Sequence, residues 1–298
     1  MNIELRHLRY FLAVAEELHF GRAAQRLSIS QPPLSQQIMQ LEQAIEAKLL
    51  TRTNRSVQLT PAGKQFLSDT RAILQQVEQA AERAARLERG EEGELRIGFT
   101  SSAPFTGLVS DALYQFRQRW PQVHIQIQEI NTRQQLAPLH EGRLDLGVMR
   151  NTALPPDLRY QLLLREPLRA VVHWAHPLAD EETISVRALA SEPFVFFDPQ
   201  GGTALHGEIL SLLRRYQIKP YIMQEVGEAM TILGLVATGL GVSILPASFA
   251  RARLADVVWL PLREEDALSE IWLVWSAERE PSMQMRNMMR LLSPAAEK

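Results

Sequence analysis

Residues 31–40 carry a run of uncharged polar side chains that is suited to reading DNA. Gln31, Ser35, Gln36 and Gln40 face outward on one predicted helix. A glutamine amide can pair with both N6 and N7 of adenine in the major groove, and a serine hydroxyl can bond several bases. This helix alone leaves two interpretations open: a surface that reads bases, or an ordinary solvated helix face.

Two short helices must position these side chains. Apolar residues recur three and four positions apart on both sides of a break at 28–30, as expected for helices that pack together. Ser30 is predicted to cap the second helix, and Pro32 and Pro33 fit its first turn, where backbone N–H groups have no intrahelical partner. The apolar residues that define this helix-turn-helix are Ala23, Ala24, Leu27, Ile29, Leu34, Ile38 and Leu41.

A basic turn follows the second helix. Arg52 and Arg55 flank a turn that leads into a short predicted strand at 57–59. The chain as a whole has a net charge of -2, but residues 1–60 hold a small excess of Lys and Arg. A basic hairpin beside a reading helix would contact phosphates or the minor groove, so the sequence predicts a winged helix-turn-helix.

A long helix is predicted from Pro61 to about Gly90. Its apolar residues alternate four and three positions apart, with Thr70 as one polar interruption, which is the pattern of a coiled-coil seam. Such a helix favours a dimer, and the alternative is a helix packed on its own chain. The residues expected to mediate dimerisation are Phe66, Ile73, Val77, Ala80, Ala84 and Leu87.

From residue 94 onward, predicted strands (95–99, 123–127, 144–148 and 242–245) alternate with helices (107–119, 205–216 and 229–238), which indicates an α/β domain. Sheets of this class bind ligands beyond the carboxyl ends of their strands. A glycine pair containing Gly202 precedes a helix, where free backbone N–H groups can hold an anion. The candidate ligand-binding residues at these positions are Thr100, Ser101, Ser102, Asn131, Thr132, Arg150, Asn151, Phe197, Asp198 and Pro246, together with Gly201 and Gly202 of the glycine pair.

Composition excludes several function classes. The chain of 298 residues has room for about two domains and contains no Cys, which excludes disulfides, thiolate metal sites and cysteine nucleophiles. No signal-peptide core or membrane span is apparent, so we expect a soluble, cytoplasmic protein without membrane contacts. No G-x-S-x-G or H-E-x-x-H motif occurs, so we expect no enzyme, catalytic residue, metal or cofactor. An enzyme or solute binder built on residues 94–298 is the rival interpretation.

Five segments together resemble the LysR-type transcriptional regulators, and most closely those that sense benzoate, muconate and related aromatic-degradation compounds. The segments are LRHLRYF at 5–11, SQPPLSQQI at 30–38, LTPAG at 59–63, EGRLDLG at 141–147 and GLVATGLGVSILP at 234–246. The resemblance implies an all-α start that becomes a winged helix-turn-helix, then a linker helix, then a periplasmic-binding-protein-like effector domain of two α/β halves.

The resemblance also implies boundaries and partners. The DNA-binding domain would span 1–60, the dimerisation helix 61–90 and the effector domain 91–298, with half I at about 91–165 and 268–298 and half II at about 166–267. The expected partners are double-stranded promoter DNA, a small-molecule effector that is an aromatic or dicarboxylic acid, and further copies of the chain in a homodimer or homotetramer.

Site roles follow from the same resemblance. The major groove would be read by Gln31, Pro32, Ser35 and Gln36, with Arg52 and Arg55 contacting the backbone from the wing. An effector carboxylate would meet Thr132 and a hydroxyl after the first strand, on Ser102 or Ser101. Phe197 and Pro246 would form apolar walls. Arg150 has two open roles: a charge-assisted bond to the effector, or a salt bridge between the halves.

Overall fold

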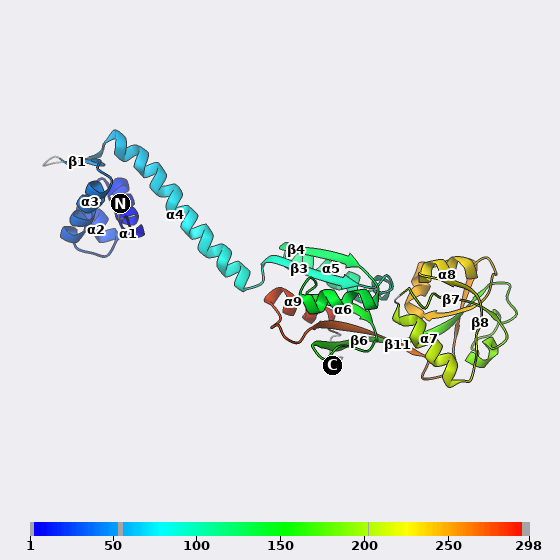
Figure 1. The fold of residues 1–298 in the computed structure, drawn as a ribbon. Coiled ribbons are helices and arrows are strands. Elements are labelled where there is room, and N and C mark those ends of the chain that lie inside the picture. The colour runs from blue at the N-terminus through cyan, green and yellow to red at the C-terminus, as the bar shows by residue number, and fades with distance from the viewer. Residues whose placement is uncertain (1–2, 53–55, 202, 294–298) are drawn as a thin grey trace. The chain divides into compact units, whose positions relative to one another are not determined.

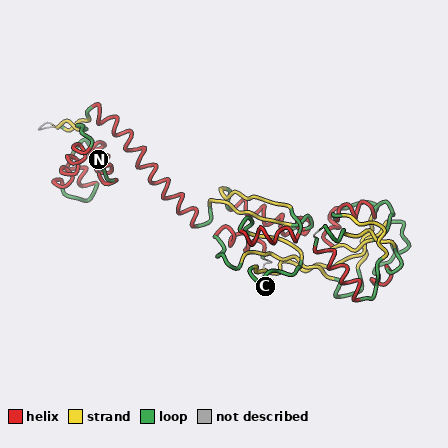
Figure 2. The backbone as a smooth tube through the Cα atoms, viewed as in Figure 1, coloured by secondary structure: helices red, strands yellow, loops and turns green. Residues whose placement is uncertain are grey.

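The computed structural model describes residues 3–52, 56–201 and 203–293. The chain divides into two compact units, Met1–Arg86 and Leu87–Lys298. Figure 2 shows that the first unit is mainly helical and that strands and helices alternate in the second. Among the described residues, no helix is both long and apolar enough to cross a membrane.

The first unit is a winged helix-turn-helix, as predicted. Its core contains Phe11, Leu34, Ile38 and Leu41, each with no exposed surface. The two strands pair antiparallel, so that Leu50 lies opposite Leu59. The elements are α1 (Leu5–Glu17), α2 (Phe20–Arg26), α3 (Gln31–Ala44), β1 (Leu50–Arg52) and β2 (Val57–Leu59).

The predicted cap of α3 is only partly correct. Ser30 occupies the N-cap position, but in the described structure its hydroxyl makes no hydrogen bond to the first turn. An N-cap side chain normally accepts a bond from the second or third backbone N–H of the helix. Those positions in α3 are Pro32 and Pro33, which have no N–H to donate.

Glu42 joins α3 to the wing. This residue is 4% exposed, and its carboxylate accepts hydrogen bonds from the backbone N–H groups of Leu49 (2.9 Å) and Leu50 (3.1 Å). The exposed Lys48 ammonium lies 3.0 Å from the second carboxylate oxygen. Gly63 fits the helix α4 (Pro61–Glu88) against the same segment, because a Cβ there would lie 2.0 Å from the Leu49 carbonyl oxygen.

The predicted long helix is α4 (Pro61–Glu88). Phe66 packs edge-on against Phe11 in the core of the first unit, with ring centroids 5.2 Å apart, and Thr70 is fully buried. Further along, Ile73 and Leu87 are more than 40% exposed. The beginning of the predicted seam therefore packs within the unit, and the apolar residues beyond it reach the surface.

The second unit has two lobes with separate apolar cores, half I and half II. In half I, β3 (Glu92–Phe99) pairs parallel with β4 (Gln122–Glu129), as Figure 1 shows, and also with β5 (Leu146–Arg150). Half II packs two helices around the parallel pair β7–β8. Half I contains β3 (Glu92–Phe99), η1 (Ala103–Thr106), α5 (Leu108–Arg119), β4 (Gln122–Glu129), α6 (Thr132–Glu141), β5 (Leu146–Arg150) and α9 (Met283–Leu292). Half II contains η2 (Val186–Leu189), β7 (Pro193–Phe197), α7 (Ala204–Arg215), β8 (Tyr221–Val226), α8 (Ala229–Val236), β9 (Ser243–Pro246), η3 (Ala247–Ala252) and β10 (Val257–Pro261).

Two long strands join the halves. In β6 (Leu158–His173), residues 158–167 pair with β11 (Leu268–Ser276) of half I, and residues 168–173 pair with β9 and β10 of half II. The resulting sheet has the order β10-β6-β11-β5-β3-β4, with β9 also on β6. The sequence pattern did not reveal β6 or β11. It also placed the third strand two residues early, because the Leu144 backbone N–H bonds the Pro138 carbonyl at the end of α6.

We predict that Glu42→Ala destabilises the first unit by about 2 kcal/mol or more. The substitution leaves two buried N–H donors without an acceptor, and each costs about 1–3 kcal/mol. Thermal unfolding by circular dichroism and amide exchange at Leu49 and Leu50 measure the effect. Lys48→Ala is the control, because its exposed ion pair contributes about 1 kcal/mol or less. Equal loss in both variants would contradict the assignment.

Candidate functional site

The polar face of α3 lies opposite its buried face. Gln31, Pro32 and Gln36 are exposed and Ser35 is partly exposed, whereas Leu34 and Ile38 are buried. The face carries amides and a hydroxyl but no charged group. This surface presents the donors and acceptors that base edges require, without a charge that would bind phosphate equally at any sequence.

The wing contributes a cation next to this unit's core. Arg52 ends β1, is exposed, and holds its guanidinium 4.4 Å from the centre of the Phe20 ring. This cation–π contact keeps the charge at a defined place on the surface. Arg55, the second predicted wing contact, lies outside the described residues.

A cavity of about 140 Å³ in the second unit lies where the strand ends of half I meet half II. Seven of the candidate ligand-binding residues line it: Thr100, Ser101, Ser102, Asn131, Arg150, Phe197 and Gly201. Gly202 lies outside the described residues. The other lining residues are Glu129, Ile130, Gln134, Thr203, Leu205, Gly227, Glu228, Ala229 and Phe249.

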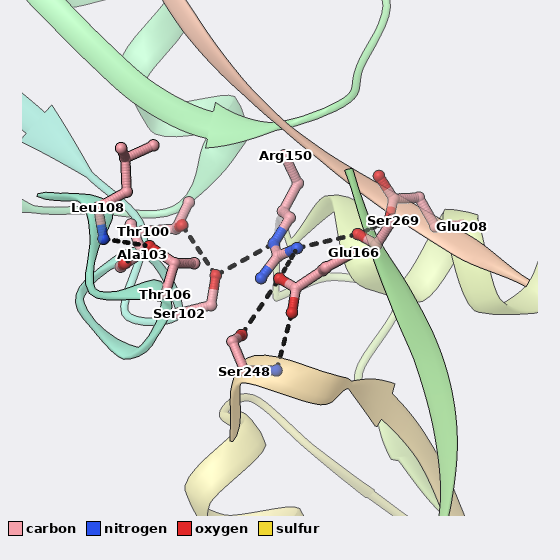
Figure 3. Close-up of polar contacts among 10 residues, drawn as sticks. All are labelled: Thr100, Ser102, Ala103, Thr106, Leu108, Arg150, Glu166, Glu208, Ser248 and Ser269. Atoms are coloured by element: carbon pink, nitrogen blue, oxygen red, sulfur yellow. Dashed lines mark hydrogen bonds and ion pairs between the residues drawn. The ribbon is translucent and has the colours of Figure 1, made fainter. Parts of the chain in front are cut away.

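Arg150 ends β5 and is 1% exposed. Its Nη1 donates to Glu166 Oε1 (2.8 Å) and to Ser269 Oγ (3.0 Å), and its Nε donates to Ser102 Oγ (3.2 Å), as Figure 3 shows. Its Nη2 is buried and has no hydrogen-bond partner within the described chain. A buried cation with one free donor group therefore lies at the cavity wall.

Glu166 extends this contact into half II. Its carboxylate accepts hydrogen bonds from the backbone N–H (2.8 Å) and the hydroxyl (3.1 Å) of Ser248, a residue of η3. The ion pair between Arg150 and Glu166 is therefore part of the connection between the halves. The two roles predicted for Arg150, a salt bridge between the halves and a bond to an effector, are compatible. Its Nη1 makes the ion pair with Glu166, and its Nη2 stays available.

A second carboxylate approaches Arg150 through Ser269. The Ser269 hydroxyl donates to Glu208 on α7, so a chain of hydrogen bonds runs from Arg150 to half II. Burial raises the pKa of Glu208 to about 7, despite the opposing effects of the Ser269 hydrogen bond and the Arg150 charge. Sequence reasoning missed Glu208 and Glu166, because neither stands in a motif that distinguishes it from a solvated helix or strand residue.

Two hydrogen bonds join exposed and partly exposed lining residues, which mark the mouth of the cavity. The Ser101 hydroxyl donates to Glu228 Oε2 (2.8 Å), and Asn131 Nδ2 donates to the Gly201 carbonyl (3.0 Å). Each bond links half I to half II. Asn131 also caps α6 by accepting a bond from the Gln134 N–H (2.9 Å), so the first turn of that helix is held at the cavity.

Four of the candidate residues do not line the cavity: Thr132, Asn151, Asp198 and Pro246. Thr132 follows Asn131, is fully buried, and its hydroxyl has no partner among the described residues. Pro246 is the last residue of β9 and pairs with Leu168 of β6, which holds it in the sheet. The apolar wall predicted from Phe197 and Pro246 is formed by Phe197 with Leu205 and Phe249, which the sequence analysis did not select.

We predict that the raised pKa of Glu208 makes the chain less stable as pH rises. From its ordinary value of 4.5 up to about 7, the folded state binds more protons at Glu208 than the unfolded state does. The stabilisation that results from this raised pKa is therefore complete below pH 4.5 and is lost as pH rises through about 7. The loss in the free energy of unfolding amounts to up to about 3 kcal/mol.

Glu208→Gln should remove this dependence. Thermal unfolding of the wild type and of Glu208→Gln is compared from pH 5 to 8. The variant should gain stability relative to the wild type as pH rises. A difference that is constant with pH would contradict the prediction.

Comparisons with known proteins agree with both units. Residues 5–64 match the family described as bacterial regulatory helix-turn-helix protein, lysR family, and residues 88–297 match the LysR substrate binding domain. The chain is 63% identical over 287 residues to the uncharacterized HTH-type transcriptional regulator YnfL of Escherichia coli (strain K12), covering 96% of this chain and 97% of YnfL. It is 35% identical to the HTH-type transcriptional regulator BenM of Acinetobacter baylyi, covering 91% and 89%.

A solved structure extends the likeness to the complete fold. Full-length CbnR complexed with its target DNA superposes with a TM-score of 0.85 at 27% identity, covering 98% of this chain and all of that one. The helix-turn-helix and the two-lobed α/β unit agree with the two family matches. The chain belongs to the LysR family of bacterial transcriptional regulators and is a DNA-binding regulator with an effector-binding domain, not an enzyme.

Proposed function

We propose that the polar face of α3 reads base edges in the promoter and that the wing contacts the DNA backbone. Gln31, Pro32, Ser35 and Gln36 meet the major groove, and Arg52 and Arg55 serve the wing. The support is the uncharged, outward surface of α3 and the fixed position of the Arg52 guanidinium over Phe20. CbnR, a relative in structure, has been crystallised with its target DNA.

We further propose that the chain contains three functional segments. Residues 1–60 bind DNA, residues 61–90 mediate dimerisation and residues 91–298 bind the effector. Ile73, Val77, Ala80, Ala84 and Leu87 form the dimer seam of α4, because they reach the surface at a coiled-coil spacing. Phe66, which packs on Phe11, supports the seam from inside the unit. Dimers pair into tetramers, and the protein works in the cytoplasm, where promoter DNA is found.

The effector that we propose is a small carboxylic acid held in the cavity between the halves. The observation that carries this proposal is the free Nη2 of Arg150, a buried cationic donor at the cavity wall. Leaving such a donor unpaired is costly, and a charge-assisted bond to a carboxylate contributes about 1.5–3 kcal/mol. The Ser102 hydroxyl lies beside this donor at the cavity wall. Thr132 does not line the cavity as described, but it follows the lining residue Asn131 and its buried hydroxyl has no described partner, so we propose that this hydroxyl reaches the carboxylate when the ligand binds. Ser101, and Gly202 outside the described residues, are proposed as further effector contacts. Phe197 and Pro246 contribute apolar surface behind it.

Effector binding acts through the strands that join the halves. Arg150 is bonded to Glu166 on β6 and Ser269 on β11, so a ligand that binds Arg150 favours one arrangement of these strands. A ligand can shift such an equilibrium only by the difference between its affinities for the two arrangements. A change of one to a few kcal/mol is sufficient to alter DNA binding or activation.

We predict that Gln31→Ala combined with Ser35→Ala reduces sequence discrimination. The variant should lose about 1–3 kcal/mol per lost base contact on the DNA upstream of its own gene, with little change on scrambled DNA. Electrophoretic titration at two salt concentrations measures both affinities. Arg52→Ala is the control: it should weaken binding to both DNAs and reduce the salt dependence. Unchanged discrimination in the double variant would contradict the assignment of α3.

We predict that Thr132→Val weakens effector binding without destabilising the free protein. The Thr132 hydroxyl has no described partner, so its replacement by a methyl group should leave the melting temperature equal or slightly higher. Thermal shifts of the full chain are measured with acetate, propanoate, succinate and benzoate. An acid at 100 times its Kd raises stability by about 2.7 kcal/mol.

The acid that stabilises the wild type should bind the Thr132→Val variant at least tenfold more weakly. Thr238→Val, at an exposed position of half II, is the matched control and should bind normally. We avoid Arg150→Ala, because a buried carboxylate that loses its partner costs about 3–5 kcal/mol and obscures ligand effects. No stabilisation by any carboxylate would overturn the proposed effector class.

A further inference from the structure

The charges around the cavity are unbalanced. Arg150 is the one cation among the described lining residues, and it is already paired with Glu166 at 2.8 Å. Glu129 and Glu228 also line the cavity, and neither forms an ion pair in the described part of the chain. The free Nη2 donor of Arg150 is suited to a carboxylate, but the charged residues that line the cavity carry a net negative charge. A ligand with two carboxylates would place one of them near Glu129 or Glu228.

The Arg150 guanidinium and the Glu228 carboxylate are hydrogen-bonded to two consecutive residues, Ser102 and Ser101. Ser102 Oγ accepts a bond from Arg150 Nε (3.2 Å), and Ser101 Oγ donates to Glu228 Oε2 (2.8 Å). The Cα atoms of consecutive residues are about 3.8 Å apart. The guanidinium and the Glu228 carboxylate therefore border one small space, and a short ligand can reach both.

The cavity is suited to a small ligand. Its volume of about 140 Å³ is close to that of an engineered apolar cavity of about 150 Å³ that binds benzene, a ligand of six non-hydrogen atoms. Phe197, Leu205 and Phe249 form an apolar part of the lining. The site thus accepts a small molecule with a carboxylate, a cationic group and a short apolar portion.

We propose that the effector is a small zwitterion of the α-amino acid class, with its carboxylate on Arg150 and its ammonium group on Glu228. This inference rests on the proposed carboxylate site and specifies its ligand. Glu228 is then the residue that determines specificity, and Glu129 adds to the negative potential at the mouth. A zwitterion supplies the missing acceptor to Arg150 Nη2 and a cation to the unpaired carboxylates without adding net charge.

The test compares acids that differ only by an amino group. Titration calorimetry of the full-length chain is performed with propanoate and L-alanine, with butanoate and L-2-aminobutanoate, and with benzoate. The amino acid of each pair should bind at least tenfold more tightly than its parent acid. In Glu228→Gln this preference should disappear, with the affinity for the parent acid unchanged or higher.

Two variants separate specificity from structure. Glutamine keeps a carbonyl oxygen that can accept the Ser101 bond, so Glu228→Gln removes charge while preserving this hydrogen bond. Glu225→Gln, an exposed residue of β8 outside the cavity lining, is the matched control and should keep the preference for amino acids. Glu129→Gln should reduce the preference by a smaller factor.

The outcomes distinguish the two proposals. Parent acids and amino acids that bind equally well, with a response to Thr132→Val but none to Glu228→Gln, would overturn the zwitterion and leave the carboxylate site intact. Binding of benzoate with no binding of the small amino acids would have the same meaning. No binding of any compound, as shown by calorimetry and thermal shift, would overturn both proposals.

Discussion

The buried guanidinium of Arg150 is the constraint on which the second unit depends. A charge taken out of water costs several kcal/mol unless it is paired and hydrogen-bonded. Its partners Ser102, Glu166 and Ser269 come from three separate segments of the chain. All of these segments must be in place before the charge is stabilised, so the site forms together with the sheet around it.

The same arrangement explains how one small cavity can influence two lobes. Glu166 lies on β6, which pairs with β11 in half I and with β9 and β10 in half II. Through Ser248 and Glu208, the polar contacts of Arg150 reach two further elements of half II. A ligand bound to Arg150 therefore contacts a side chain whose hydrogen-bond partners connect the two lobes. Such a ligand can bind with different affinity to two arrangements of the lobes.

The first unit differs from the second in where its polar groups lie, because most of them are at the surface. Its core is apolar, and the outward face of α3, which we propose reads DNA, carries solvated amides and a hydroxyl. Glu42 is a buried carboxylate among the described residues of this unit, and it accepts hydrogen bonds from the backbone where α3 meets the wing. In the proposed complex with DNA, rigid attachment of the wing matters for recognition, because contacts to phosphates position the helix that reads the bases.

The sequence by itself determined the elements whose signals are local. Apolar residues at helical spacing predicted α3 and α4, and the alternation after residue 94 predicted the α/β class, because periodicity depends only on neighbours along the chain. The strand ends also pointed to Ser101, Ser102, Arg150 and Phe197, all of which line the cavity. Only the tertiary structure decided which partners those residues meet. Glu166, Glu208, Glu228 and Phe249 come from distant segments in ordinary sequence contexts, and their roles arise from burial and proximity that no local pattern encodes.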